Sequence, residues 1–419
     1  MKRHQWAGFA AIFILSACAQ LAGIEEPIDP PPGTVGKAPG SVCSKDEECA
    51  DAHCVDGVCC DSACTETCKA CNVTDNVGTC SNVPIYEQDP NADDVLACVG
   101  TSHLCDGNGA CKLELGQTCT ADAECLWSSC SGTECTPPSC GGLADKCGPG
   151  AIATESCCAS NIIEGGKFFR SNDTKYPATV NRFRLDRFEV TVGRFRKFVE
   201  AYPGNQAIMA DAGKHPLIEA SGWDTTWNSG MPIDTTAFIT NLKCDDKYQT
   251  WTDDPGPNEQ LAINCVSWHE AFAFCIWDGG RLPTEAEWNY AAAGGEEQRE
   301  YPWSGMTISP NEAFYNCVNT SCTLADFPNV GSKSPAGDGK WFQADMAGSV
   351  WEWTLDVFQD PYITPCDNCA NVSPNSTVER VIRGGGWYPG EAQQHTSFRD
   401  KAIPSARQSG VGIRCARDR

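Results

Sequence analysis

The chain has few positive charges, with 31 Lys and Arg against 55 Asp and Glu and a formal charge of −24. Nucleic acid and anionic lipid would repel such a surface, so neither is expected as a partner. Long apolar runs are also lacking. The run from Trp6 to Leu15 is too short to span the roughly 30 Å core of a bilayer. The six histidines are not clustered, which disfavours a histidine metal centre.

Cysteine, in contrast, is abundant, with 29 residues. Twenty lie between Cys43 and Cys158, eight lie between Cys244 and Cys415, and one is Cys18. Without Cys18 both groups are even in number, as full disulfide pairing in an oxidising compartment requires. Zinc would call for repeated short C-x-x-C pairs, and the spacings do not provide them. Disulfides are therefore favoured over metal.

The N-terminus has the features of a secretory signal. Basic residues precede the apolar run, which ends in Leu15-Ser16-Ala17-Cys18. This tetrapeptide resembles the bacterial lipobox, in which the cysteine is lipidated and becomes the new N-terminus. We therefore predict a signal peptide over 1–17, a lipid anchor in the membrane at Cys18 and a Pro-rich tether over 18–42. Ala19 favours the outer membrane. The alternative is ordinary cleavage that leaves Cys18 free.

Residues 43–158 contain an internal repeat. The spacing C-x5-C-x4-C-x4-C occurs twice without insertion, at Cys43, Cys49, Cys54 and Cys59 and at Cys119, Cys125, Cys130 and Cys135. Aliphatic residues are scarce there, so bridges must replace a conventional core. The pattern resembles cysteine-rich lipoprotein modules of predatory soil bacteria of the myxobacterial type. Such modules bind or space, and the pattern predicts no catalytic site and leaves the disulfide connectivity open.

Two segments have the redox-type C-x-x-C spacing, Cys68 to Cys71 and Cys366 to Cys369. A thioredoxin-like interpretation requires a βαβ frame around the motif, and neither segment has one. Structural bridges are the favoured interpretation.

The segment Asp345-Met346-Ala347-Gly348-Ser349-Val350-Trp351-Glu352-Trp353 places one carboxylate between two large rings. Strand alternation would direct both rings to one face and Glu352 to the other. A buried carboxylate needs a cation or a donor, and Asp345, Glu352 and the carbonyls near Gly348 form an oxygen-rich corner suited to Ca²⁺. The alternative is a buried Trp pair with a salt-bridged Glu352.

The sequence before the Asp345 segment contains signals for one strand and three helices. Residues 183–190 alternate like a half-buried strand, and Thr191 can cap the helix that follows. Capping boxes at Ser267 to Glu270 and Thr284 to Glu287 predict two further helices, which end at Gly279-Gly280 and Gly294-Gly295.

Four segments in order carry a resemblance: Arg281-Leu282-Pro283-Thr284-Glu285-Ala286-Glu287-Trp288, the Asp345 to Trp353 segment, Arg383-Gly384-Gly385-Gly386-Trp387 and Gly412-Ile413-Arg414-Cys415. They resemble the formylglycine-generating enzyme (sulfatase-modifying factor) family. The resemblance runs from about Ile162 to the C-terminus and implies a domain over 160–419. Its expected fold is irregular α+β and related to C-type lectins. In the sequence this domain follows the disulfide-rich module, which is expected to have little secondary structure.

The resemblance also implies bonds and ligands. A disulfide is expected between Cys275 and Cys415, together with one or two structural Ca²⁺ ions. The ligands implied for one ion are Asp345, the carbonyls of Gly348 and Val350, and Glu352. Those implied for the other are Asn316, the Cys317 carbonyl and Asp326, the last with a different spacing from the family. Hard oxygen ligands suit Ca²⁺ better than a transition metal.

The family's oxidase converts a substrate cysteine to formylglycine through two cysteines that bind Cu(I). Pro389 and Gln394 occupy those positions here, and no cysteine lies between Cys369 and Cys415. Copper is therefore not expected, and catalytic residues are not assigned. The iron-dependent sulfoxide synthases, a related branch, need a histidine-bearing bundle that this chain lacks.

These observations favour a lipid-anchored envelope protein that is not an enzyme. Its C-terminal domain would bind an exported peptide, protein or glycan in a groove walled by Trp351, Trp387 and Tyr388, unless these rings belong to the core. One alternative is a formylglycine-generating oxidase acting on exported sulfatase-type substrates. A third possibility is a purely structural envelope component.

Overall fold

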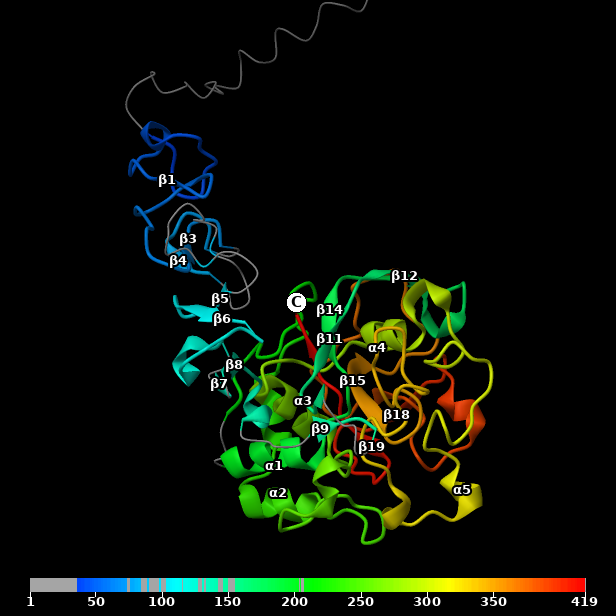
Figure 1. Cartoon of the computed structure of the whole chain (residues 1–419). Coiled ribbons are helices and arrows are strands. Elements are labelled where there is room, and N and C mark those ends of the chain that lie inside the picture. Colours follow the sequence, from blue (N-terminus) through cyan, green and yellow to red (C-terminus); the bar gives the residue numbers. More distant parts are fainter. Residues whose placement is uncertain are drawn as a thin grey trace, which may run out of the picture. The chain divides into compact units, whose positions relative to one another are not determined.

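The computed structural model describes residues 36–418 except 74–75, 84–88, 90–97, 99–102, 115, 127–129, 132, 142–145, 150–154, 203 and 205–206. The signal peptide, Cys18 and most of the tether lie outside these residues. The chain forms two compact units, one up to Ala97 with Gly107–Ala110, and one with Cys98–Asp106 and Cys111–Arg419 (Figure 1). Within the described part, no helix has the length and apolar character needed to cross a membrane.

Unit 1 is made of small hairpins joined by cystines. Its elements are the 3₁₀ turn η1 (Asp46–Glu48), the hairpin of β1 (Cys54–Val55) with β2 (Val58–Cys59), and the hairpin of β3 (Lys69–Ala70) with β4 (Ser81–Asn82). The disulfides include Cys43–Cys54, Cys49–Cys59, Cys60–Cys71 and Cys64–Cys80. Buried sulfur replaces an aliphatic core here.

The second copy of the cysteine repeat lies in unit 2 and is bridged in the same way. Cys119 pairs with Cys130 and Cys125 with Cys135, so each repeat joins its first cysteine to its third and its second to its fourth. The local hydrogen bonds also match. The Asp46 carboxylate accepts from the Cys54 amide at 2.7 Å, and the Asp122 carboxylate accepts from the Cys130 amide at 2.7 Å. The two copies of the cysteine repeat thus share one disulfide connectivity, which the sequence left open.

The cystine-bridged part of unit 2 has short elements only. They are β5 (His103–Cys105), β6 (Cys111–Leu113), η2 (Asp122–Glu124), β7 (Cys130–Ser131), β8 (Glu134–Cys135), η3 (Pro138–Cys140), β9 (Lys146–Cys147) and β10 (Glu155–Ser156). Cys140–Cys158 and Cys147–Cys157 close its last segment. This segment shares its unit with the C-terminal domain, and the domain boundary near 158 stays a prediction.

The rest of unit 2 is irregular α+β. One sheet has the strand order β11 (Ser160–Ile163), β14 (Phe183–Asp186), β20 (Ala416–Arg417). A second has the order β12 (Gly166–Phe169), β13 (Pro177–Val180), β16 (Cys366–Asp367). A third has the order β18 (Asp400–Ala402), β17 (Arg380–Arg383), β15 (Trp351–Val357), β19 (Val411–Gly412). Its helices are α1 (Val192–Ala201), α2 (Thr235–Asn241), α3 (Trp268–Trp277), α4 (Glu285–Ala292) and α5 (Cys317–Thr320). Short 3₁₀ turns are η5 (Arg170–Asn172), η6 (Thr225–Gly230), η7 (Pro257–Gln260), η8 (Gly295–Glu297), η9 (Leu324–Asp326) and η10 (Glu391–Gln394).

The predicted helix starts are present. Thr191 accepts from the Arg194 amide at the start of α1, and Ser267 and Thr284 form full capping boxes at α3 and α4. A cap of this kind contributes about 1 kcal/mol. Both α3 and α4 are buried almost all round, because strands or other helices cover each of their faces, and their amphipathic pattern is correspondingly weak.

A buried network of four charges joins distant parts of unit 2. Arg194 on α1 donates to Asp186 at 2.9 Å and to Asp278 at 2.6 Å, and Arg417 pairs with the same two carboxylates. All four side chains are at most 1% exposed. The Ser139 hydroxyl accepts from Arg194 at 3.0 Å, so the last cystine-bridged segment is tied to α1 as well.

Candidate functional site

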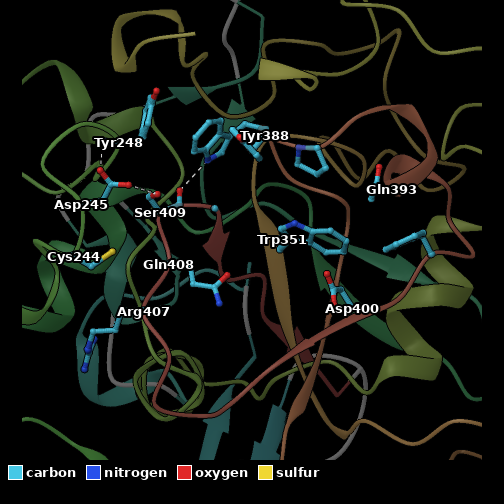
Figure 2. A pocket seen from close by; sticks show the side chains of 14 residues that line it. Cys244, Asp245, Tyr248, Trp351, Tyr388, Gln393, Asp400, Arg407, Gln408 and Ser409 are labelled. Carbon is cyan, nitrogen blue, oxygen red and sulfur yellow. Dashed lines mark hydrogen bonds between the residues drawn. The ribbon is translucent and has the colours of Figure 1, made fainter. Parts of the chain in front are cut away.

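A pocket of about 620 Å³ lies beside the start of β15. Its lining comes from four segments: Cys244, Asp245 and Tyr248; Trp351; Trp387, Tyr388, Pro389, Gln393, Phe398 and Asp400; and Arg407, Gln408, Ser409 and Gly410. In Figure 2, Cys244, Asp245 and Arg407 stand on one side and Gln393 and Asp400 on the other. The three predicted groove residues, Trp351, Trp387 and Tyr388, all line it.

The aromatic side chains of this pocket differ in exposure. Trp387 is 5% exposed and donates its indole N–H to the Ser409 carbonyl at 2.9 Å, while Trp351 is 8% exposed. Both rings therefore line the pocket and are also part of the hydrophobic core, which the sequence analysis gave as the alternative to a groove role. Tyr388 is 54% exposed and its ring stands edge-on to Trp387 at 5.4 Å. A ring in this position can stack on a ligand.

The glycine turn before the pocket packs closely against Trp351. Gly386 has φ of +64°, and a Cβ there would lie 2.8 Å from Cδ1 of Trp351. The family's serine would therefore collide with this indole ring. A side chain at position 386 would therefore require the Trp351 ring to shift.

The polar groups of the pocket give it a negative character. Asp245 accepts from the Ser409 hydroxyl at 2.7 Å (Figure 2), and the Asp400 carboxylate accepts from the Lys401 amide. Arg407 also lines the pocket, but its charge is neutralised by Glu270, to which it donates two hydrogen bonds. Such a lining suits a neutral or cationic ligand better than an anion.

Pro389 and Gln394, which the resemblance places where the oxidase has its two cysteines, have structural positions of different kinds. Pro389 lines the pocket. Gln394 is 1% exposed and donates to the Gly386 carbonyl at 3.1 Å, which holds the glycine turn. The sulfur in the pocket lining belongs to Cys244, which is bridged to Cys265.

The predicted disulfide and the Glu352 partner are both visible near this region. Cys275 is bonded to Cys415, the pairing that the resemblance implies. Glu352 is fully buried, accepts from both Nε and Nη2 of Arg414 at 2.7–3.0 Å and accepts from the Trp288 indole at 2.6 Å. This is the salt-bridged arrangement that the sequence left open as the alternative to calcium.

A third carboxylate was missed by the sequence reasoning. Glu189, between β14 and α1, is fully buried and accepts from the Ser349 hydroxyl at 2.8 Å and the Val350 amide at 3.1 Å. Burial and the charges of Asp345 and Glu352 raise its pKa well above the usual range. The signal available in the sequence was a glutamate inside the apolar run Phe188-Glu189-Val190.

Asp345 has a related environment. Its side chain is 7% exposed and its carboxylate accepts from the Gly331 amide at 2.5 Å, while burial raises its pKa to about 6. Glu189, Asp345 and Glu352 thus all interact electrostatically with the guanidinium of Arg414. Glu352 of the first implied calcium set is already paired with Arg414, and Asp345 is the carboxylate of that set that makes no ion pair among the described residues.

The second implied calcium set has a different environment. Asp326 is exposed and its carboxylate accepts from the amide and hydroxyl of Thr323, which lowers its pKa. The Cys317 carbonyl accepts from the Ser321 amide at 3.0 Å in the short helix α5. The Asn316 amide oxygen accepts from Asn319. Each predicted ligand accepts a local hydrogen bond, and calcium at this set stays a prediction.

The fold, its glycine turn and its terminal disulfide define a domain of the sulfatase-modifying-factor type. A family model described as "Sulfatase-modifying factor enzyme 1-like domain" matches residues 150–419. This match covers more than half of the chain, and the chain belongs to that family.

Curated relatives carry two kinds of name. The formylglycine-generating enzyme of Streptomyces coelicolor is 35% identical over 259 residues, which cover 56% of this chain and 78% of the relative. The mouse protein called inactive C-alpha-formylglycine-generating enzyme 2 is 27% identical over 291 residues, 61% of this chain and 84% of the relative. Among solved structures, PvdO from Pseudomonas aeruginosa aligns with a TM-score of 0.42 at 19% identity, covering 62% of this chain and 94% of that one. Family membership alone therefore does not decide whether the domain is catalytic.

Proposed function

We propose that this chain is an envelope lipoprotein whose sulfatase-modifying-factor domain binds a ligand without chemical conversion. The observation that carries the proposal is the replacement of both thiol positions, by Pro389 at the pocket and by Gln394 in the turn. A Cu(I) centre needs soft thiolate donors, and the cysteine that lines the pocket is in a disulfide. The disulfide content indicates an oxidising compartment, and a lipid at Cys18 would hold the protein on the outer membrane.

The ligand class follows from the pocket. An exposed Tyr388 ring, two carboxylates and the side-chain amide of Gln408 offer stacking and hydrogen bonds to a ligand. These groups suit a glycan or an extended peptide segment of an exported protein, either neutral or positively charged. A volume of about 620 Å³ admits a short oligomer of either kind.

Replacing Tyr388 by alanine is expected to weaken binding about tenfold, because an exposed stacking ring contributes on the order of 1.4 kcal/mol. The ligand is first found by screening the purified chain on glycan and peptide arrays, and its Kd is then measured by calorimetry for both chains. Phe342→Ala is the matched control, since Phe342 is 63% exposed and does not line the pocket. An equal loss in both variants, or no ligand on any array, contradicts the proposal and favours a structural role.

The competing function is a formylglycine-generating oxidase, favoured by the 35% identity to the Streptomyces coelicolor enzyme. Incubating the chain with Cu(I), O₂ and a cysteine-containing sulfatase peptide distinguishes the two. We expect the peptide mass to stay unchanged. The mass loss of a thiol-to-aldehyde conversion would establish the oxidase instead.

We further propose that Ca²⁺ binds at Asp345, with Glu189 and the carbonyls of Gly348 and Val350 close by. Saturating Ca²⁺ is expected to raise the free energy of unfolding by about 2.7 kcal/mol when its concentration is a hundred times Kd. Urea unfolding with and without a chelator measures this effect. Asp345→Asn should abolish it and Asp326→Asn should preserve it, because Asp326 belongs to the second implied set. Equal stability with and without chelator contradicts the site.

A further inference from the structure

The Cys366–Cys369 disulfide differs from the other C-x-x-C segment. Cys71 of the first segment is bonded to Cys60, whereas Cys366 and Cys369 are bonded to each other across two residues. Cys366 is 4% exposed and lies in β16, while Cys369 is partly exposed in the loop that follows. Cys369 is therefore the less buried residue of the pair, and unequal burial of two bonded cysteines favours attack at the more accessible one.

A guanidinium stands at the reachable sulfur. Nη1 of Arg170, in η5, lies 3.7 Å from Sγ of Cys369, and its Nη2 donates to the Ile363 carbonyl at 2.7 Å, which fixes the guanidinium there. Arg170 is 5% exposed. A cation in contact with sulfur stabilises the thiolate, and it thereby makes Cys369 both a better attacking group and a better leaving group.

A buried carboxylate shares the same small recess of about 90 Å³. Asp356 on β15 accepts from the amides of Glu285 and Asn371. Burial, together with the charge of Glu285, raises the pKa of Asp356 to about 7. Glu285 itself is neutralised by Arg399 and Arg383. Asp356 is thus able to take up or release a proton near neutral pH.

The other side of the disulfide adjoins an apolar pocket of about 560 Å³. Its lining includes Phe168, Phe169, Ala178 and Pro365, next to Cys366. β16 is the edge strand of its sheet, pairing with β13 on one side only in the described residues. An exposed strand edge beside an apolar pocket can hold an extended polypeptide by main-chain hydrogen bonds and one apolar side chain.

We propose that Cys366–Cys369 is a thiol–disulfide exchange centre that accepts two electrons from a dithiol polypeptide bound along β16. A thiolate of the polypeptide attacks Sγ of Cys369, and Cys366 leaves with the electron pair of the broken S–S bond. The second polypeptide thiolate then attacks the polypeptide's own sulfur in this mixed disulfide and releases Cys369 as a thiolate held by Arg170. The polypeptide loses two electrons and two protons and gains a disulfide, while Cys366 and Cys369 become thiols.

The first test uses the unaltered chain in a graded series of reduced and oxidised dithiothreitol. After alkylation, peptide mass spectrometry gives the reduced fraction of each cysteine pair. Cys366–Cys369 is expected to be half reduced at a ratio of reduced to oxidised dithiothreitol at least tenfold lower than Cys317–Cys322, a similarly short bridge with no arginine at its sulfur. Joint reduction of the two pairs at one ratio overturns the proposal.

The second test measures the free thiol of Cys369 in a Cys366→Ser chain. Adding Arg170→Gln is expected to slow its alkylation at pH 7 about tenfold, because losing the cation raises the thiol pKa by about one unit. Arg170→Lys should restore most of the rate. Arg182→Gln, at an exposed arginine paired with Glu164, should leave it unchanged. A Cys369 rate that is equal with and without Arg170 overturns the assigned role.

The third test identifies the co-reactant. The unaltered chain is mixed with a dithiol peptide carrying apolar flanks, with the same peptide carrying polar flanks, and with reduced glutathione. The apolar peptide is expected to be oxidised at least five times faster than the other two, and Phe169→Ser should remove the difference. Reaction with glutathione at the same rate overturns the polypeptide assignment.

Discussion

Replacing Cys275 and Cys415 together by alanine is expected to lower the free energy of unfolding by about 5 kcal/mol. The bond spans 140 residues, and in the chain-entropy description a loop of this length restricts the unfolded chain most. Both sulfurs are fully buried, so the substitution also leaves a small cavity. Urea denaturation under non-reducing conditions, followed by tryptophan fluorescence, measures the change.

The matched control for this bond is Cys317→Ala with Cys322→Ala, a bridge that spans five residues. The same description gives about 2 kcal/mol for this short loop. If the long bridge proves no more stabilising than the short one, the bond does not act by restricting the unfolded chain. The order of the two effects is thus the decisive quantity.

Arg194→Met is expected to cost about 3–5 kcal/mol, because it leaves Asp186 and Asp278 buried with one guanidinium between them. The substitution keeps most of the side-chain volume, so lost packing against Phe274 is small. The change in unfolding free energy, measured in urea at neutral pH, reports the effect. Lowering the pH should reduce the cost, since protonation removes the unpaired charge.

Lys197→Met on the same helix is the control for Arg194. The Lys197 side chain is 40% exposed and lies 3.8 Å from Glu200, and a surface pair of this kind contributes between zero and about 1 kcal/mol. A loss below about 1 kcal/mol in the Arg194 variant would show that the second arginine, Arg417, alone satisfies both carboxylates.

The family assignment came from local signals in the right order. Capping residues such as Ser267 and Thr284 act within one turn of their own helix, so they can be recognised from the local sequence. The glycine run 384–386 and the terminal cysteine are likewise recognised from the few residues next to them in the sequence. The absent thiol pair at Pro389 and Gln394 needed only an ungapped comparison with the oxidase pattern, and the structure then placed Pro389 at the pocket.

The partners of buried charges were harder to predict. Glu352 offered two interpretations, and the guanidinium that meets it comes from Arg414, 62 residues away. Glu189 meets the Asp345 segment across more than 150 residues. Spacing says nothing about such encounters, because they depend on how two separate strands close on each other.

The sequence by itself determined the α+β family fold, the starts of the capped helices and the even cysteine groups. Each of these is a property of a residue and its near neighbours. The tertiary structure alone decided which cysteines pair, that Arg414 neutralises Glu352, that the Ser409 loop completes the aromatic pocket, and that Arg170 meets Cys369. These contacts join segments far apart along the chain, and only packing of the whole domain brings them within bonding distance.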